Sequence, residues 1–131
     1  MTRNVLALLL LTACGSNAPD NAAICRAAAA GASHVEVVAR GTVTRLLGES
    51  SSHEGVMMRL SSDCAETLRV EINTNFGGVV PLHAGQSIII KGEYETDPDG
   101  GVIHWTHFDP RGHHDSGFVQ TGFNTRDSNK T

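Results

Sequence analysis

The chain reads Val35-Glu36-Val37-Val38-Ala39-Arg40-Gly41-Thr42-Val43-Thr44 at the point where its hydrophobic pattern first becomes regular. Small or apolar residues occupy every second position from Val35 to Val43, and successive side chains of a β-strand point to opposite faces. The stretch therefore predicts a long, half-buried strand. Gly41 would let such a strand bend or form a bulge without a side-chain clash, as the curved strands of small barrels do.

The same alternation predicts four further strands downstream. They cover residues 56–60, 68–72, 87–94 and 101–108. Short turns join them into two antiparallel hairpins, and the irregular connection between the hairpins is too short and too rich in glycine to predict a helix. A long curved strand, a hairpin, an irregular connection and a second hairpin indicate an all-β fold, a small five-stranded OB-fold-like barrel. An SH3-like or lipocalin-like barrel is the alternative that the strand count leaves open.

Residues 1–13 carry the pattern of a bacterial lipoprotein signal peptide. Arg3 gives a short positive start, an apolar run follows, and the sequence ends in Leu11-Thr12-Ala13-Cys14. The apolar run is far shorter than the roughly 20 residues that span a bilayer. We therefore expect the signal to be removed and Cys14 to carry a lipid that anchors the protein in the cell envelope. Gly15 after the cysteine favours the outer membrane, facing the periplasm, if the host has two membranes.

The remainder of the chain is long enough for one compact domain and too short for two. Residues 14–33, which begin with the lipidated cysteine, are small, polar and alanine-rich, so we expect a tether with a helical turn at 22–30. The barrel domain is predicted at 34–112 and a polar tail at 113–131. The expected membrane contact is made by the lipid, through this tether.

Cysteine usage points to an oxidising compartment. With Cys14 assigned to acylation, Cys25 and Cys64 are the two thiols left to pair. A disulfide between them would close a loop of about 40 residues and stabilise a small domain by roughly 4 kcal/mol in the chain-entropy model. Two separately buried thiols are the alternative.

Charge argues against one broad class of partner. The chain has 10 Lys and Arg against 14 Asp and Glu, a formal net charge of −4 at pH 7. Binding to nucleic acid or to an anionic membrane surface relies on clustered basic residues, so general nucleic-acid binding is not expected. The sequence also lacks a Gly-x-Ser-x-Gly motif and a phosphate-binding glycine loop after a strand.

Two segments resemble a known family. Lys91-Gly92-Glu93-Tyr94-Glu95 and the stretch Gly101-Val102-Ile103-His104-Trp105-Thr106-His107-Phe108-Asp109-Pro110-Arg111-Gly112-His113 are similar to the signature of the bacterial domain of unknown function 3465. The strand pattern extends the resemblance over roughly residues 35–113. It implies a small secreted or lipidated protein with no assigned activity. This chain departs from the family pattern at Phe108, where a second histidine is usual, and at 116–119, where a tryptophan is usual.

Chemically active side chains are densest near the end of the last predicted strand. The candidates are Glu93, His104, Trp105, His107, Asp109, Arg111 and His113, with His114 beside them. Imidazole and carboxylate groups are ligands for zinc or copper. However, His104 and His107 point to opposite faces of a regular strand, so they can share an ion only if the strand bends at or after Thr106. We expect no cofactor and leave a metal site open.

A structural interpretation explains the same residues. Trp105 shares a face with Ile103, so we expect it in the core. Asp109-Pro110-Arg111-Gly112 is typical of a turn in which the aspartate caps the backbone. Arg111 is then expected to form a planar, two-pronged pair with Glu93 or Glu95 on the adjacent strand.

Three functional hypotheses remain at this point. The favoured one is a non-enzymatic, membrane-tethered binding module that holds a small ligand or an envelope protein on the barrel face. The second is a metal-dependent hydrolase, nuclease-like, that uses the histidine and carboxylate cluster; this analogy rests on the fold alone. The third is a structural envelope lipoprotein without a small ligand.

Overall fold

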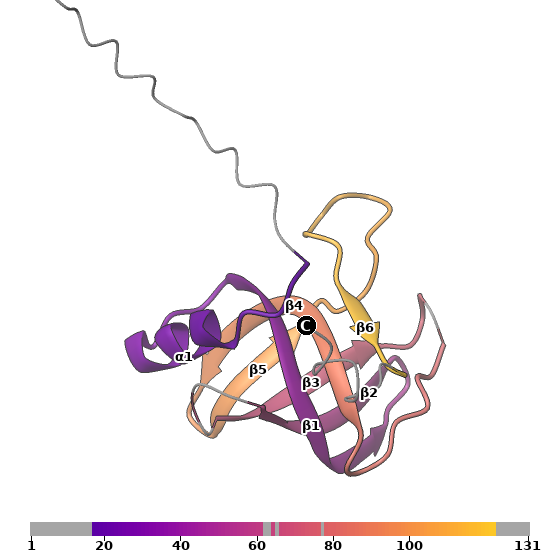
Figure 1. Cartoon of the computed structure of the whole chain (residues 1–131). Coiled ribbons are helices and arrows are strands. Elements are labelled where there is room, and N and C mark those ends of the chain that lie inside the picture. Colours follow the sequence, from indigo (N-terminus) through magenta and orange to yellow (C-terminus); the bar gives the residue numbers. More distant parts are fainter. Residues whose placement is uncertain (1–16, 62–63, 65, 77, 123–131) are drawn as a thin grey trace, which may run out of the picture.

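A computed structural model of the protein describes residues 17–61, 64, 66–76 and 78–122 (Figure 1). The predicted signal peptide and Cys14 lie outside these residues. Within the described part, no helix is both long enough and apolar enough to cross a membrane.

Five strands close into a barrel. They are β1 (Val35–Glu49), β2 (His53–Leu60), β3 (Thr67–Asn73), β4 (Ser87–Asp97) and β5 (Gly100–His104). Their order is β1-β2-β3-β5-β4, and a further pairing of β1 with β4 closes the ring (Figure 1). The pair β3–β5 is parallel and the other pairs are antiparallel. The predicted all-β, OB-like barrel is confirmed, with the hairpins where the sequence indicated them.

The long first strand allows the barrel to close because it pairs with two neighbouring strands. Its first half pairs with β4 and its second half pairs with β2, and Gly41 is opposite Leu60 on one side and Ile88 on the other. A Cβ at Gly41 would collide with the Arg59 carbonyl and the Met58 side chain. The glycine in the alternating stretch therefore lies at the point where β1 passes from one neighbour to the other.

Alternate residues of the five strands fill the interior. The fully buried strand residues are Ala39, Val43, Val56, Met58, Leu68, Val70, Ile88, Ile90 and Ile103, with Tyr94 almost fully buried beside them. Their removal from water is the main favourable contribution to folding.

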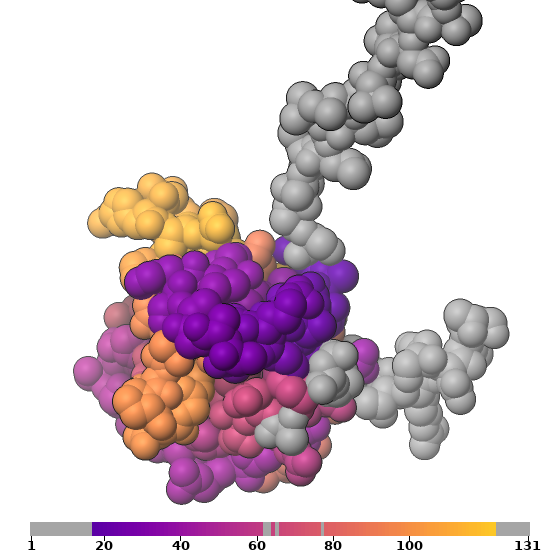
Figure 2. Space-filling model, turned by 90° about the vertical axis from the view of Figure 1, so that its left-hand side faces the viewer, coloured from indigo at the N-terminus to yellow at the C-terminus, as the bar shows by residue number. Residues whose placement is uncertain are grey.

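A helix, α1 (Asn21–Ala30), packs on the barrel. The Asp20 side chain accepts a hydrogen bond from the Ala23 backbone at its start, and Gly31 ends it in the left-handed conformation. Ile24 is fully buried in the core, and Asn21 forms two 2.9 Å hydrogen bonds with the Arg40 backbone. Figure 2 shows this N-terminal segment, in indigo and purple, lying directly on the barrel. The segment predicted as a tether is thus part of the domain from about residue 20 onward.

A sixth strand, β6 (Phe118–Gln120), pairs with β4 through Lys91, Ile90 and Ile89. Both β6 and α1 lie outside the range 34–112 predicted for the barrel domain. Just before β6, a Cβ at Gly117 would collide with the carbonyls of Lys91 and Trp105. The backbone of the predicted tail therefore packs tightly against the end of the last barrel strand.

The predicted disulfide is present. Cys25 of α1 is bonded to Cys64 in the turn between β2 and β3, with a Cα–Cα distance of 6.0 Å. The bond joins the N-terminal helix covalently to the barrel.

Candidate functional site

The site begins where β5 ends. The strand stops at His104, four residues earlier than predicted, because Trp105 takes a left-handed backbone conformation with φ of +59°. The Thr106 hydroxyl then donates a 3.0 Å hydrogen bond to the Glu71 carbonyl and fixes the segment to β3. His104 and His107 are therefore not on a regular strand. The argument that alternation separates them is wrong, and both line one pocket.

Trp105 is not a core residue. The residue is 40% exposed. Its left-handed backbone breaks the strand alternation, so its side chain does not point into the core as that of Ile103 does. The indole ring instead makes edge contacts with His104 and His114, at centroid distances of 5.7 and 4.3 Å.

The turn predicted at Asp109 is present, and the Asp109 carboxylate organises it. Oδ1 accepts the Arg111 N–H at 2.9 Å, and Oδ2 accepts those of His113 and His114 at 2.5 and 3.0 Å. Burial acts to raise the pKa of this carboxyl, but the three N–H donors outweigh it and hold the pKa below its ordinary value. Asp109 therefore stays ionised and fixes the loop that it shares with His113 and His114, the Asp109 loop.

Arg111 does not form the expected clamp. Its side chain is exposed and makes no ion pair with any described residue; only its backbone N–H contacts Asp109. Glu93 and Glu95 instead face His34 and His104. The physical reason is that the predicted strand 101–108 would have brought the turn with Arg111 close to β4, whereas β5 stops at His104. His113 is exposed and contributes its backbone N–H to the same turn.

Three aromatic rings contact one another in a row, and the stack of the first two ends on the third. Phe76 lies parallel to His107 at 4.7 Å, and His107 meets His114 edge-on, with 3.1 Å between their Nε2 atoms. Burial, and then the neighbouring His114, lower the pKa of His107. His107 is therefore neutral near pH 7, so that one of the two Nε2 atoms donates and the other accepts.

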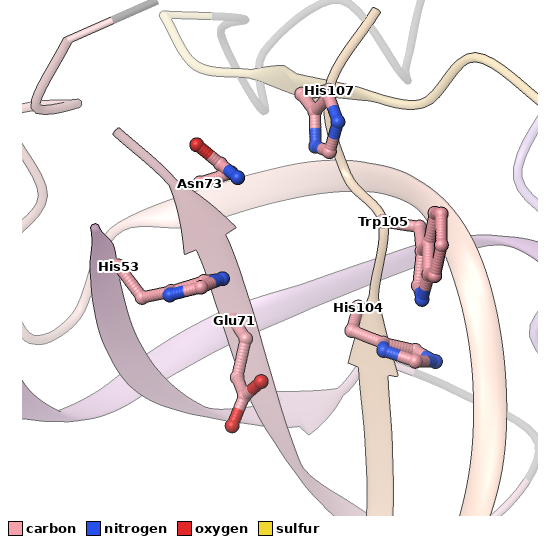
Figure 3. Close-up of a pocket in the computed structure, with 6 residues that line it drawn as sticks. All are labelled: His53, Glu71, Asn73, His104, Trp105 and His107. Carbon is pink, nitrogen blue, oxygen red and sulfur yellow. The ribbon is translucent and has the colours of Figure 1, made fainter. Parts of the chain in front are cut away.

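A pocket of about 290 Å³ lies beside this stack. It is lined by His53, Glu71, Asn73, His104, Trp105 and His107. The first three come from β2 and β3 and stand on one side, and the last three, from the end of β5 and the segment after it, stand on the other (Figure 3). A second hollow, of about 380 Å³, shares Trp105 and His107 and is otherwise lined by Phe76 and the Asp109 loop.

Several polar groups of the pocket remain available to a ligand. Asn73 Oδ1 accepts the Asn75 N–H at 2.8 Å, which leaves its amide nitrogen pointing into the pocket (Figure 3). Ser52 bonds His53 at Nδ1, which leaves Nε2 available. His107 Nδ1 is buried and has no hydrogen-bond partner among the described residues. Buried polar atoms are usually paired, so an unpaired one in a pocket wall is a place for a ligand atom.

Sequence reasoning missed the β2–β3 wall, that is His53, Glu71 and Asn73. Glu71 and Asn73 alternate with the buried residues of β3, so they could have been assigned to its outer face. The signal was the fold itself, because OB folds bind ligands on the face of strands 2 and 3.

Comparison with known proteins yields a family. A model of the family described as "Protein of unknown function (DUF3465)" matches residues 5–126. The chain belongs to this family. The DUF3465 match includes both segments of the expected signature, which lie in β4 and in the stretch from β5 to the Asp109 turn. No curated protein matches this DUF3465 member, and no solved structure does.

Proposed function

We propose that this DUF3465 protein is a lipid-anchored envelope protein whose OB-like barrel binds a short, uncharged oligosaccharide in the pocket between β3 and the end of β5. The observation that carries the proposal is the composition of that pocket. An exposed indole stands opposite a carboxylate, an amide and an imidazole, at the barrel face where OB folds hold oligonucleotides and oligosaccharides.

Electrostatics favour the oligosaccharide over the oligonucleotide. The pocket contains the carboxylate of Glu71, whose Oε1 lies 3.3 Å from Arg69 on the same strand. Among the residues that the structure describes, no lysine or arginine lines it. Phosphate binding relies on clustered basic side chains. Hydroxyl groups, in contrast, both donate and accept, so they suit the mixture of Asn73 Nδ2, His53 Nε2 and the unpaired His107 Nδ1.

The size of the pocket also restricts the ligand. Its volume of about 290 Å³ is at the lower end of the range for small-molecule sites. It has room for one compact unit, and neighbouring units of a chain would extend over the exposed Trp105 toward the second hollow. Tryptophan suits this place because it offers a large apolar face and one N–H donor.

Trp105 provides the test, since it is the single tryptophan of the chain and its fluorescence reports on the pocket directly. The purified chain in detergent is titrated with a tetrasaccharide of N-acetylglucosamine and, separately, with a single-stranded DNA tetranucleotide. We expect a saturable change with the sugar alone. Asn73→Ala and Glu71→Gln should each weaken binding about tenfold, which is about 1.4 kcal/mol.

Phe108→Ala is the matched control, because Phe108 is 67% exposed and lines neither hollow. The affinity of the Phe108→Ala variant for the sugar should equal that of the unchanged protein. Saturable binding of the DNA in preference to the sugar would contradict the proposed ligand class. Cleavage of the tetrasaccharide during the titration would contradict the non-enzymatic role.

The anchor is tested separately. Cys14→Ser should leave an unprocessed precursor that takes up no labelled fatty acid, because the thiol is both the acylation site and the residue that defines cleavage. Fractionation of the envelope should find the unchanged protein in the outer membrane of a host with two membranes. Normal processing of the variant would rule out the lipoprotein assignment.

A further inference from the structure

A second group of metal-binding side chains gathers where β1 begins beside β4 and β5. It consists of His34, directly before β1, Glu93 and Glu95 on β4, and His104 at the end of β5. Glu93 and Glu95 are two residues apart on one strand, so both carboxylates lie on the same face. His104 is the register partner of Glu93. His34 joins them because its left-handed backbone, with φ of +61°, turns the chain at this corner.

The ligand atoms of three of these residues, His34, Glu93 and Glu95, lie close together, and His104 Nε2 faces the two carboxylates. His34 Nδ1 lies 2.9 Å from Glu93 Oε1 and 3.3 Å from Glu95 Oε1. His104 Nε2 lies 3.7 and 3.5 Å from the same two oxygens. The ligand atoms of His34, Glu93 and Glu95 all lie within 4.8 Å of one another. Ligands at about 2.0–2.2 Å from a tetrahedral zinc ion are separated by roughly 3.4 Å, which is close to the four His–Glu distances.

Hydrogen bonding within the cluster does not satisfy His104. Its Nε2 is buried and has no hydrogen-bond partner among the described residues, since 3.5–3.7 Å to the carboxylates is too long for a hydrogen bond. Such an atom is rare in folded proteins. A bound ion in front of both carboxylates would satisfy it without moving the strands.

No lysine or arginine among the described residues forms an ion pair with the two carboxylates. Lys91 lies on the same face of β4, but its ammonium group donates to Asn17 at 3.2 Å. Among the described residues, the ion-pair partners of Glu93 and Glu95 are the two histidines. Two carboxylates held together repel each other unless a cation lies between them.

We propose that His34, Glu93, Glu95 and His104 bind one divalent transition-metal ion of the zinc type. Imidazoles and carboxylates are zinc ligands, and with His104 as the fourth protein ligand the site would be closed and structural rather than catalytic. The ion would link the start of β1 to β4 and β5. His34 is 77% exposed, so the ion can enter from solvent. This set differs from the His104 and His107 pair considered from the sequence, and it does not depend on the sugar-binding role.

The test uses the full chain, without an affinity tag, after removal of metals with a chelator. Calorimetric titration with Zn²⁺ should show one ion per chain, and the ion should raise the melting temperature. His34→Asn should weaken binding at least about tenfold and remove the thermal shift. Asparagine tolerates the left-handed conformation, so this change removes the imidazole and leaves the backbone in place. Glu95→Gln, which preserves side-chain size, should behave in the same way.

Two matched variants locate the site. His83→Ala removes an exposed histidine outside the cluster, and His107→Ala removes a histidine of the pocket; both should bind Zn²⁺ as the unchanged chain does. Absence of saturable binding by Zn²⁺, Co²⁺ and Mn²⁺ would overturn the proposal. Unchanged binding in the His34→Asn, Glu95→Gln double variant would also overturn it, as would loss of binding in His107→Ala with retention in His34→Asn.

Discussion

Removal of the Cys25–Cys64 bond is expected to lower the free energy of unfolding by about 2–5 kcal/mol. The two cysteines are 39 residues apart, and closing such a loop is worth about 4 kcal/mol in the chain-entropy model. The loss should be near the upper end of the range, because the bond fixes α1, which places Ile24 in the core. A small domain has a total stability of only about 5–15 kcal/mol, so much of it depends on this bond.

Urea denaturation of the Cys25→Ser, Cys64→Ser double variant measures the loss. All chains carry Cys14→Ser, so that no other thiol reacts, and they are compared with one another as the unprocessed precursor. The unchanged pair should resist thiol labelling until a reductant is added, and the reduced protein should then unfold at the same urea concentration as the double variant. Immediate labelling of two thiols without reductant, or equal stability of the two chains, would contradict the prediction.

The alternation of side chains was sufficient to predict the barrel but not the elements that cover it. The strands can be recognised in the sequence because burial of one face makes apolar side chains recur at every second residue. The helical turn predicted at 22–30 is confirmed as α1, but its packing on the barrel was not predicted. The sequence of the helix is largely alanine, and Ile24 is its one large buried side chain. Its place in the domain depends on contacts with distant residues, such as the hydrogen bonds from Asn21 to Arg40.

At Trp105 the apolar alternation of the sequence continues, although strand β5 has already ended. Ile103 and Trp105 alternate as if on one strand, but the left-handed backbone at Trp105 terminates β5. A tryptophan in that conformation is rare, so no propensity argument predicts it. The same bend brings His104 and His107 to one pocket and leaves Arg111 away from Glu93.

Proximity in the sequence was a poor guide to partners in the site. The histidines from His104 to His114 suggested one cluster, but the structure also adds partners from distant parts of the chain. His34 contacts Glu93 across 59 positions of the chain, and His53 reaches the pocket from β2. Only closure of the barrel brings such residues together, so an expected fold has to precede any list of site residues.

Asp109→Ala is expected to abolish most of the sugar affinity of the pocket, a loss of at least about tenfold, and to lower the melting temperature. The Asp109 carboxylate accepts three backbone N–H groups, from Arg111, His113 and His114, and hydrogen bonds to an ionised acceptor are the stronger kind. Without it these donors lose their partner, and the His114 ring is no longer held against His107. The pocket would then lose its ordered wall even though Asp109 does not line it.

Arg111→Lys is the control that separates this view from the clamp expected from the sequence. The exposed Arg111 side chain has no ion-pair partner among the described residues, and lysine keeps the backbone N–H that Asp109 accepts. Arg111 lines the second hollow, where lysine keeps the positive charge, so the change should leave sugar affinity unaltered and stability within about 0.5 kcal/mol. Tryptophan fluorescence titration and thermal melts of both variants measure the difference. Equal damage from Arg111→Lys and Asp109→Ala would show that the guanidinium fork is needed after all, because lysine cannot reproduce its planar geometry.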